Sequence, residues 1–86
     1  MLGITYTPDF VRQYKSLEDS LQIEIVEKLK LLKNKDNHKS LRVHKLHGKL
    51  SDCHSFSINY RIRLVFEYMN KNEIVCHFVG DHDIYK

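Results

Sequence analysis

The sequence has few of the features that mark secreted, disulfide-stabilised or membrane proteins. Its only cysteines, Cys53 and Cys76, do not have CxxC spacing, and no apolar run approaches the roughly 18 residues of a membrane span. Residues 1–5 show no basic segment followed by a long apolar one, as a secretory signal would. We therefore expect a cytosolic protein, not associated with a membrane, whose thiols stay reduced.

The chain also has no internal repeat and no low-complexity segment, and it is only 86 residues long. Domains typically run from about 50 to 250 residues, so we predict a single domain over residues 1–86. A chain of this size buries only roughly 60% of its unfolded surface, which leaves room for one core and one surface site. It has no room for a cofactor-binding domain, and we expect no cofactor.

Charge is distributed unevenly along the chain. Residues 1–34 carry five basic and five acidic side chains, whereas residues 35–63 carry seven basic and two acidic ones, a net charge of +5. Residues 64–86 carry two basic and four acidic side chains, a net charge of −2. Four histidines lie in the basic middle segment. Such a segment suits a polyanion such as RNA, although a solvated basic face would have the same composition.

The N-terminal part predicts a strand and two helices. Residues 2–7 alternate apolar with small or polar side chains, and Thr7, Pro8 and Asp9 then form a helix start, with Thr7 as the cap. Asp19 and Gln22 resemble a capping box, which predicts a second helix to about residue 34. One face of that helix carries apolar residues at a 3.6-residue period: Leu21, Ile25, Leu29 and Leu32.

The C-terminal part predicts β-structure. Apolar and polar residues alternate over residues 55–58, 60–68 and 74–79, and residues 69–72 suit a hairpin turn. In this pattern Ile74, Cys76 and Phe78 share one face, and Val75, His77 and Val79 share the other. The fold class is therefore α+β: an N-terminal strand, two helices and an antiparallel meander, with the helices packed on a four-stranded antiparallel sheet.

Three short motifs, in this order of elements, resemble the RelE/ParE toxin superfamily. Residues 46–51 read Leu-His-Gly-Lys-Leu-Ser, like the family's Leu-x-Gly-x-Leu-Ser loop, and residues 63–66 read Arg-Leu-Val-Phe, like its Arg-Leu-Val-Tyr strand. The ending, residues 79–85, resembles the Gly-x-His ending with a terminal aromatic residue of RelE- and YafQ-like members. The spacing between the first two motifs is that of the YoeB branch. The resemblance covers the whole chain.

This resemblance implies the toxin of a type II toxin–antitoxin system. Such a toxin is a metal-independent endoribonuclease that cleaves mRNA on the ribosome, inhibits translation and is held silent by a cognate antitoxin. Two alternatives stay open, because fold does not fix function. One is a ParE-like inhibitor of DNA gyrase without nuclease activity, and the other is a catalytically degenerate protein that only binds a partner.

Metal-free RNA cleavage needs a general base, a general acid and cations that bind the phosphate, and histidine suits both proton transfers. The resemblance places His82 as the general acid, His44 as the general base or proton relay, and Arg63 at the scissile phosphate. Arg61 lies two residues earlier in the same predicted strand, so the two guanidinium groups would clamp the phosphate from one face. Tyr85 matches a terminal aromatic residue that stacks on a base or positions the RNA.

Further basic residues of the middle segment are candidates for binding the RNA backbone: Lys45, His47 and Lys49. The chain departs from RelE in the next strand, where Ser55 and Ser57 stand in place of two catalytic lysines. A tryptophan common in the YoeB branch is His54 here. These departures favour a histidine-dependent mechanism.

A zinc site is the other chemistry to consider. Its candidate ligands would be Cys76, His77, Asp81 and His82. Because Cys76 and His77 are adjacent in a predicted strand, their side chains would point to opposite faces and could not share an ion. We therefore predict no metal site from these residues.

Overall fold

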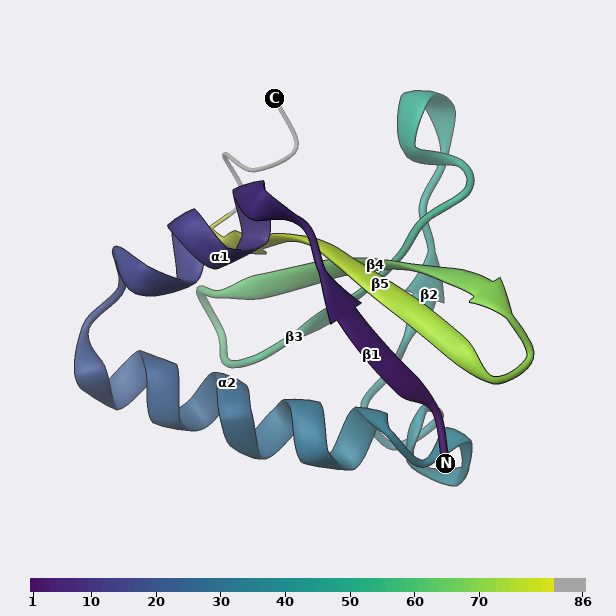
Figure 1. Cartoon of the computed structure of the whole chain (residues 1–86), viewed down its shortest axis with the longest axis horizontal. Helices are drawn as coiled ribbons and strands as arrows, with labels where there is room; N and C mark the ends of the chain where they lie inside the picture. The colour runs from purple at the N-terminus through teal and green to yellow at the C-terminus, as the bar shows by residue number, and fades with distance from the viewer. Residues whose placement is uncertain (82–86) are drawn as a thin grey trace.

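The computed structural model describes residues 1–81 (Figure 1). Its elements follow one another in this order: β1 (Gly3–Tyr6), α1 (Pro8–Lys15), α2 (Asp19–Leu32), the 3-10 turn η1 (Lys35–Asn37), β2 (His44–Lys45), the 3-10 turn η2 (Gly48–Leu50), β3 (His54–Ser57), β4 (Arg63–Asn70) and β5 (Glu73–Gly80). The predicted α+β fold class and the predicted order of elements are confirmed. The turn between β4 and β5 is also where the sequence predicted it.

The sheet has five strands, in the order β1-β5-β4-β3-β2. Strands β2 to β5 are antiparallel to their neighbours, but β1 pairs in parallel with β5. The prediction of a purely antiparallel four-stranded sheet is wrong in two respects. The short strand β2 adds a fifth member, and β1 lies parallel because the two helices carry the chain away before the meander returns it beside β1.

The core lies between the two helices and one face of the sheet. Phe10 of α1 and the predicted apolar stripe of α2 are buried against residues of β3, β4 and β5, including Phe56, Leu64, Phe66, Ile74 and Cys76. Fully burying one such side chain contributes about 1.5–3 kcal/mol. In the part of the chain that the structure describes, neither helix is long and apolar enough to cross a membrane.

The two helices begin differently. The predicted cap of α1 is confirmed: Thr7 Oγ1 accepts a hydrogen bond from Phe10 N at 3.1 Å and donates one to the His77 carbonyl at 3.0 Å. The predicted capping box of α2 is wrong, because the side chain of Gln22 points to the preceding turn. Its Nε2 donates to the carbonyls of Tyr14 and Leu17, at 3.0 and 3.1 Å. The Tyr14 carbonyl also accepts from Leu17 N at 3.1 Å, so the amide of Gln22 strengthens the turn that follows α1.

A β-bulge interrupts the pairing of β4 with β5. Val65 pairs with Phe78 and Phe66 pairs with Cys76, so His77 is an extra residue on β5. Beyond the bulge the alternation is reversed: Val79 is buried in the core, whereas Phe78 is only partly buried. The expectation that Val79 shares a face with Val75 and His77 is therefore wrong. A bulge has no residue signature here that would reveal it in the sequence.

His54 lies among aromatic rings at the start of β3. Its ring stacks on Phe66, with centroids 5.9 Å apart, and meets the edge of Tyr68 at 4.8 Å. The Nδ1 atom is buried and has no hydrogen-bond partner within residues 1–81. Burial, followed by the charge of Lys45, lowers the pKa of His54. Protonation of this ring is therefore harder in the folded protein than in the unfolded chain.

Replacing His54 with Phe should remove an acid-dependent loss of stability. Because the folded pKa of His54 lies below its unfolded value of about 6.5, the unfolded chain takes up the proton first, and stability falls as the pH drops below that value. We expect His54→Phe to lessen this fall between pH 7 and pH 5. At pH 7 it should leave the free energy of unfolding unchanged or raise it by about 1–3 kcal/mol, the cost of an unpartnered buried polar atom.

The measurement is urea unfolding at several pH values, with His47→Asn as the control at an exposed histidine. An unfolding free energy of His54→Phe that follows the same pH dependence as the parent protein would contradict the assignment.

Candidate functional site

A hairpin formed by β2, η2 and β3 carries much of the basic middle segment. It projects from the body of the molecule, with η2 at its tip (Figure 1). Two backbone bonds close its base, from Leu46 N to the Cys53 carbonyl at 2.9 Å and from Cys53 N to the Leu50 carbonyl at 2.8 Å. Gly48 opens the tip with a φ of 72°, a conformation that glycine adopts without strain.

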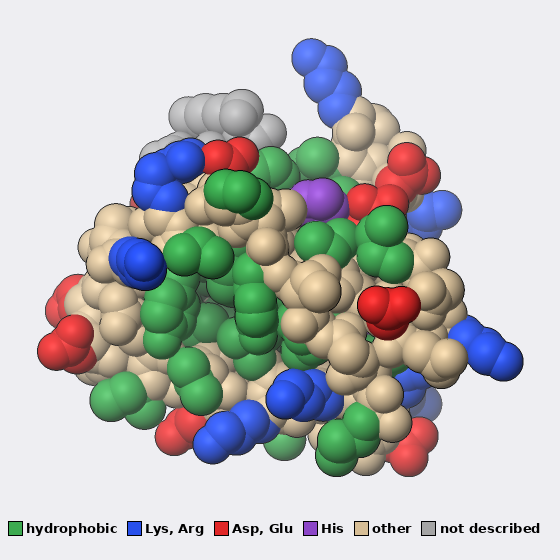
Figure 2. Space-filling view, viewed as in Figure 1, with side chains coloured by type: hydrophobic (Ala, Val, Ile, Leu, Met, Phe, Trp, Pro, Cys, Tyr) green, Lys and Arg blue, Asp and Glu red, His purple; other side chains and the backbone are tan. Residues whose placement is uncertain are grey.

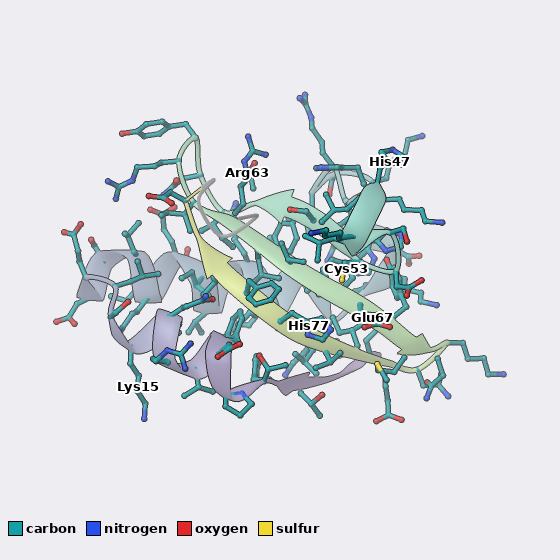
Figure 3. All side chains as sticks on the ribbon, turned by 90° about the horizontal axis from the view of Figure 1, so that it is seen from above. Lys15, His47, Cys53, Arg63, Glu67 and His77 are labelled. Carbon is teal, nitrogen blue, oxygen red and sulfur yellow. The ribbon has the colours of Figure 1, made fainter. Side chains whose placement is uncertain are left out.

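An open pocket of about 530 Å³ lies where this hairpin meets the sheet. It is lined by two apolar residues, Leu46 and Leu50, and by four of the predicted site residues: His44, His47, Lys49 and Arg63. Figure 3 shows Arg63 on β4 and His47 on the hairpin, on the same side of the sheet. His44 and Arg63, which are 19 positions apart in the sequence, therefore line one surface, as the family resemblance implied.

The strand register explains why His44 and Arg63 share a face. His44 pairs with Ser55, and Arg63 pairs with Ser57 two residues further along β3. Paired residues and residues two apart point to the same face of a sheet. Arg63 Nη1 donates to Ser57 Oγ at 3.5 Å. The two serines that replace the RelE lysines thus lie between the predicted base and the predicted phosphate ligand.

The tautomer of His44 follows from its hydrogen bond. Its Nδ1 lies 3.1 Å from the carbonyl oxygen of Arg42, and a carbonyl can only accept, so the proton is on Nδ1. In the neutral ring Nε2 then carries the lone pair and is the atom able to take a proton. The side chain of His44 is exposed, so substrate can reach it. This is the form that a general base requires.

Arg42 and Lys28 are two basic residues that the sequence analysis did not single out. With Ser40, Leu41, His44 and Ser57 they line a second hollow of about 400 Å³, which shares His44 with the first. Arg42 also holds an unusual backbone conformation, with a φ of 59°. The only sequence signal for Arg42 was its place in the basic segment. Lys28 lies on α2, and no feature of the sequence indicated that it would reach this hollow.

Two predicted residues lie elsewhere. Arg61 is not in a strand, because the side chain of Asn59 forms a turn in which Oδ1 accepts from Arg61 N and Ile62 N, both at 2.8 Å. The strand begins only at Arg63, so the predicted clamp of two arginines on one strand face is wrong. Lys45 pairs with His54 and is adjacent to His44 in β2, so its side chain points to the opposite face of the sheet. Lys45 does not line the pocket. His82 and Tyr85 lie outside the described residues.

Comparisons with known proteins identify the fold as that of the bacterial RelE/YoeB/YafQ toxins. The YoeB–YefM complex of Staphylococcus aureus matches with a TM-score of 0.76 and 26% identity, over 95% of this chain and 98% of that one. YafQ of Escherichia coli matches with a TM-score of 0.74 and 11% identity, over 99% and 98%. The RelBE2 toxin–antitoxin complex of Mycobacterium tuberculosis matches with a TM-score of 0.73 and 17% identity, over 94% and 98%.

No family model and no curated protein sequence matches the chain. The structural neighbours nevertheless confirm the resemblance to the RelE-like branch of toxins that the motifs indicated. They support a toxin of a toxin–antitoxin system.

The positive φ of Arg42, two residues before His44, can be tested by substitution. A left-handed residue other than glycine costs roughly 1–2 kcal/mol, so Arg42→Gly should keep or raise the free energy of unfolding. Arg42→Val should lower it by about 1–2 kcal/mol or more, because a β-branched residue tolerates this conformation least. Denaturant unfolding of both variants measures the difference. Similar destabilisation by glycine and valine would show that Arg42 does not hold a positive φ in solution.

Proposed function

We propose that the chain is the toxin of a type II toxin–antitoxin system and acts as an endoribonuclease on mRNA in the cytosol, inhibiting translation. The single observation that carries this proposal is the pocket in which His44 and Arg63 meet, with Lys49 and His47 at its wall. The pocket therefore suits proton transfer by histidine and binding of phosphate by cations.

In the proposed reaction the ribose 2′-oxygen attacks the adjacent phosphorus. His44 Nε2 takes the 2′-hydroxyl proton as the new P–O bond forms, and the P–O5′ bond breaks. Arg63 binds the phosphate and stabilises the charge that develops on its oxygens. The products are a 2′,3′-cyclic phosphate and a 5′-hydroxyl. Lys49 and His47, with Arg42 and Lys28 in the adjoining hollow, hold the flanking backbone.

His82 is the proposed general acid, which gives its proton to the leaving 5′-oxygen. Its support is the pairing of Gly80 with Arg63, which brings the end of β5 to the phosphate ligand. His82 follows Gly80 by two residues in the sequence. Tyr85 is proposed, on the family resemblance alone, to stack on a base. Lys45 and Arg61 lie outside the pocket, and their proposed role is to bind the ribosome or the RNA.

The decisive experiment is RNA cleavage by the purified protein, with and without ribosomes. We expect cleavage of mRNA that leaves 2′,3′-cyclic phosphate ends, since no water or metal-bound hydroxide attacks the phosphorus in this scheme. Cleavage that leaves 3′-hydroxyl ends would contradict the mechanism. Absence of cleavage in both conditions would instead support a gyrase inhibitor or a protein that only binds a partner, which a gyrase supercoiling assay distinguishes.

Arg63 and Arg61 form a matched pair for mutagenesis within the same assay. Arg63→Ala should lower the single-turnover rate by about 10²–10³-fold, because it removes a cation aimed at the developing charge. Arg61→Ala removes the same side chain two residues away, outside the pocket, and should change the rate by only a few-fold. Lys49→Ala should mainly weaken RNA binding and reduce its salt dependence by about one phosphate contact. Equal losses for Arg63→Ala and Arg61→Ala would remove Arg63 from the site.

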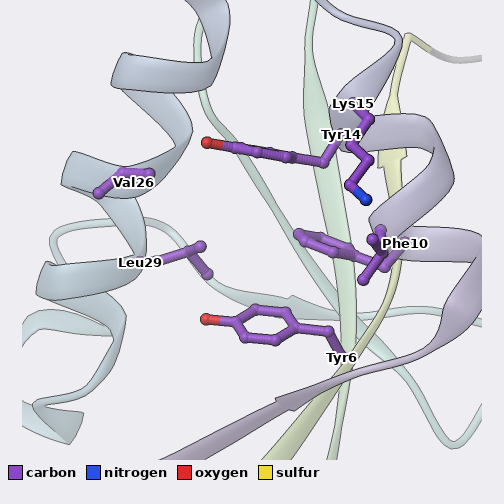
Figure 4. A pocket seen from close by; sticks show the side chains of 7 residues that line it. Tyr6, Phe10, Tyr14, Lys15, Val26 and Leu29 are labelled. Atoms are coloured by element: carbon purple, nitrogen blue, oxygen red, sulfur yellow. The ribbon is translucent and has the colours of Figure 1, made fainter.

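Control by a separate antitoxin is the second part of the proposal. An apolar groove of about 280 Å³ lies between α1 and α2, lined by aromatic and aliphatic side chains with Lys15 at its edge (Figure 4). Figure 2 shows hydrophobic side chains gathered in a hollow between these helices. Tyr6, Val11 and Val26, which line it, are 44%, 36% and 39% exposed.

We assign this groove to an acidic, amphipathic segment of the antitoxin. YoeB is found in a complex with YefM, and YafQ in a complex with DinJ. The groove offers apolar contacts, while the basic hairpin attracts negative charge and speeds association at low salt. Helix α1 is also bonded to the end of β5, because Gln13 Oε1 accepts from Val79 N at 2.8 Å. A partner on α1 therefore lies close to the strand end that leads towards His82.

Val26→Glu should weaken binding of the small protein encoded beside the toxin by tenfold or more, since it places a charge in the groove. Ile23→Glu is the matched control, because it makes the same change at an exposed apolar residue of α2 that does not line the groove. Binding is measured by titration calorimetry at two salt concentrations. Equal affinity of Val26→Glu and Ile23→Glu for the partner would place the antitoxin elsewhere.

A further inference from the structure

Three side chains with metal-binding atoms converge on the sheet, from three separate segments. Cys53 immediately precedes β3, Glu67 lies on β4, and His77 is the extra residue of the β5 bulge. The thiol sulfur, a carboxylate oxygen and a ring nitrogen all lie within 4.8 Å of one another. Figure 3 shows the three side chains together over the middle of the sheet, with Arg63 further along β4.

The cluster lies beside the bulge of β5. The ring of His77 contacts the carboxylate of Glu67, with Nε2 3.0 Å from Oε1. Cys76, the neighbouring thiol, is fully buried on the helix side of the sheet. The expectation that Cys76 and His77 cannot share an ion is thus supported, but Cys53, 24 residues before His77, takes the place that Cys76 cannot fill.

The donor set is that of a transition metal. Thiolate sulfur and imidazole nitrogen select Zn²⁺ and its chemical relatives over Mg²⁺ and Ca²⁺, which prefer oxygen ligands throughout. Zinc bonds of about 2.0–2.3 Å in a tetrahedron need donors separated by roughly 3.3–3.8 Å, so the three atoms require shifts of only about an ångström or less. Three protein ligands leave the fourth position to solvent.

The electrostatics of the cluster favour a cation. The negatively charged side chains of Glu67 and Asp52 lie near the Cys53 thiol. The same two carboxylates that oppose a thiolate attract a divalent ion, and the ion in turn stabilises the thiolate, whose proton passes to solvent. The side chains of His77 and Glu67 are 28% and 32% exposed, so an ion can enter from the solvent side.

We infer that Cys53, Glu67 and His77 bind a Zn²⁺ ion and so fasten the base of the basic hairpin to β4 and β5. The backbone of Cys53 already closes this hairpin through Leu46 and Leu50. Glu67 lies four residues from Arg63 along β4, a distance of about 13 Å. The ion is therefore too far away to touch the scissile phosphate. Its effect is to stabilise the fold and the hairpin, and it does not depend on the proposed nuclease activity.

The test uses the full chain, freed of metal with a chelator and then titrated with Zn²⁺. We expect one ion per chain and a rise in melting temperature of several degrees at saturation, because a ligand bound only by the folded state stabilises it. Substituting Co²⁺ should produce the thiolate-to-cobalt charge-transfer absorption. Titration of the unaltered protein that gives no thiolate absorption and no thermal shift would overturn the inference.

Variants assign the ligands. Cys53→Ser and His77→Gln should each weaken Zn²⁺ binding by more than the roughly 10–100-fold typical of changes around a metal site. Cys76→Ala removes the other thiol, whose pKa burial raises to about 12, and should keep the Zn²⁺-dependent shift even where it lowers the melting temperature itself. Unchanged Zn²⁺ affinity in Cys53→Ser and His77→Gln would assign the ion to other histidines and refute the site.

Discussion

The antiparallel pairing of β4 with β5 is the interaction on which the rest of the structure depends. It supplies the centre of the core, with Leu64, Phe66 and Ile74 fully buried. It also places Gly80 opposite Arg63, which connects the end of the sheet to the pocket. The bulge at His77, one of two irregularities in this pairing, returns Val79 to the core, and His77 itself contacts Glu67. One extra residue in one strand therefore serves both packing and surface chemistry.

The histidines show how context separates residues that look alike in the sequence. His38 is buried, and both of its ring nitrogens are engaged, at 2.7 Å from the hydroxyl of Tyr68 and 2.7 Å from the Leu32 carbonyl. It ties the end of α2 to the sheet and has no nitrogen left for proton transfer. His54 lies in the aromatic cluster and His77 contacts Glu67. Of the histidines among residues 1–81, only His44 and His47 line the basic pocket.

The sequence predicted best where a pattern is local and repeated. The stripe of α2, the cap at Thr7 and the β4–β5 turn each depend on residues within a few positions of one another, and the structure confirms them. Arg61 was misplaced because alternation over residues 60–68 outweighed the turn-forming Asn59. The reversal after His77 was invisible, since a bulge changes the phase of a strand without changing its composition.

The candidate site was predictable only through the family motifs. His44 and Arg63 come together through pairing across three strands, and their spacing in the sequence carries no signal of contact. The same holds for Cys53, Glu67 and His77, which come from three segments. Conversely, Lys28 reaches the second hollow from a helix, and only tertiary packing shows that it belongs with Arg42.

The shortness of β2 has a consequence for how the protein remains dispersed. A long, flat edge strand presents a row of free donors and acceptors on which another chain can assemble. Here the edge strand beside the pocket, β2, is only two residues long and ends in the charged Lys45. It also follows Arg42, whose positive φ bends the backbone. The sheet can thus expose a cationic surface at its rim without offering a template for cross-β growth.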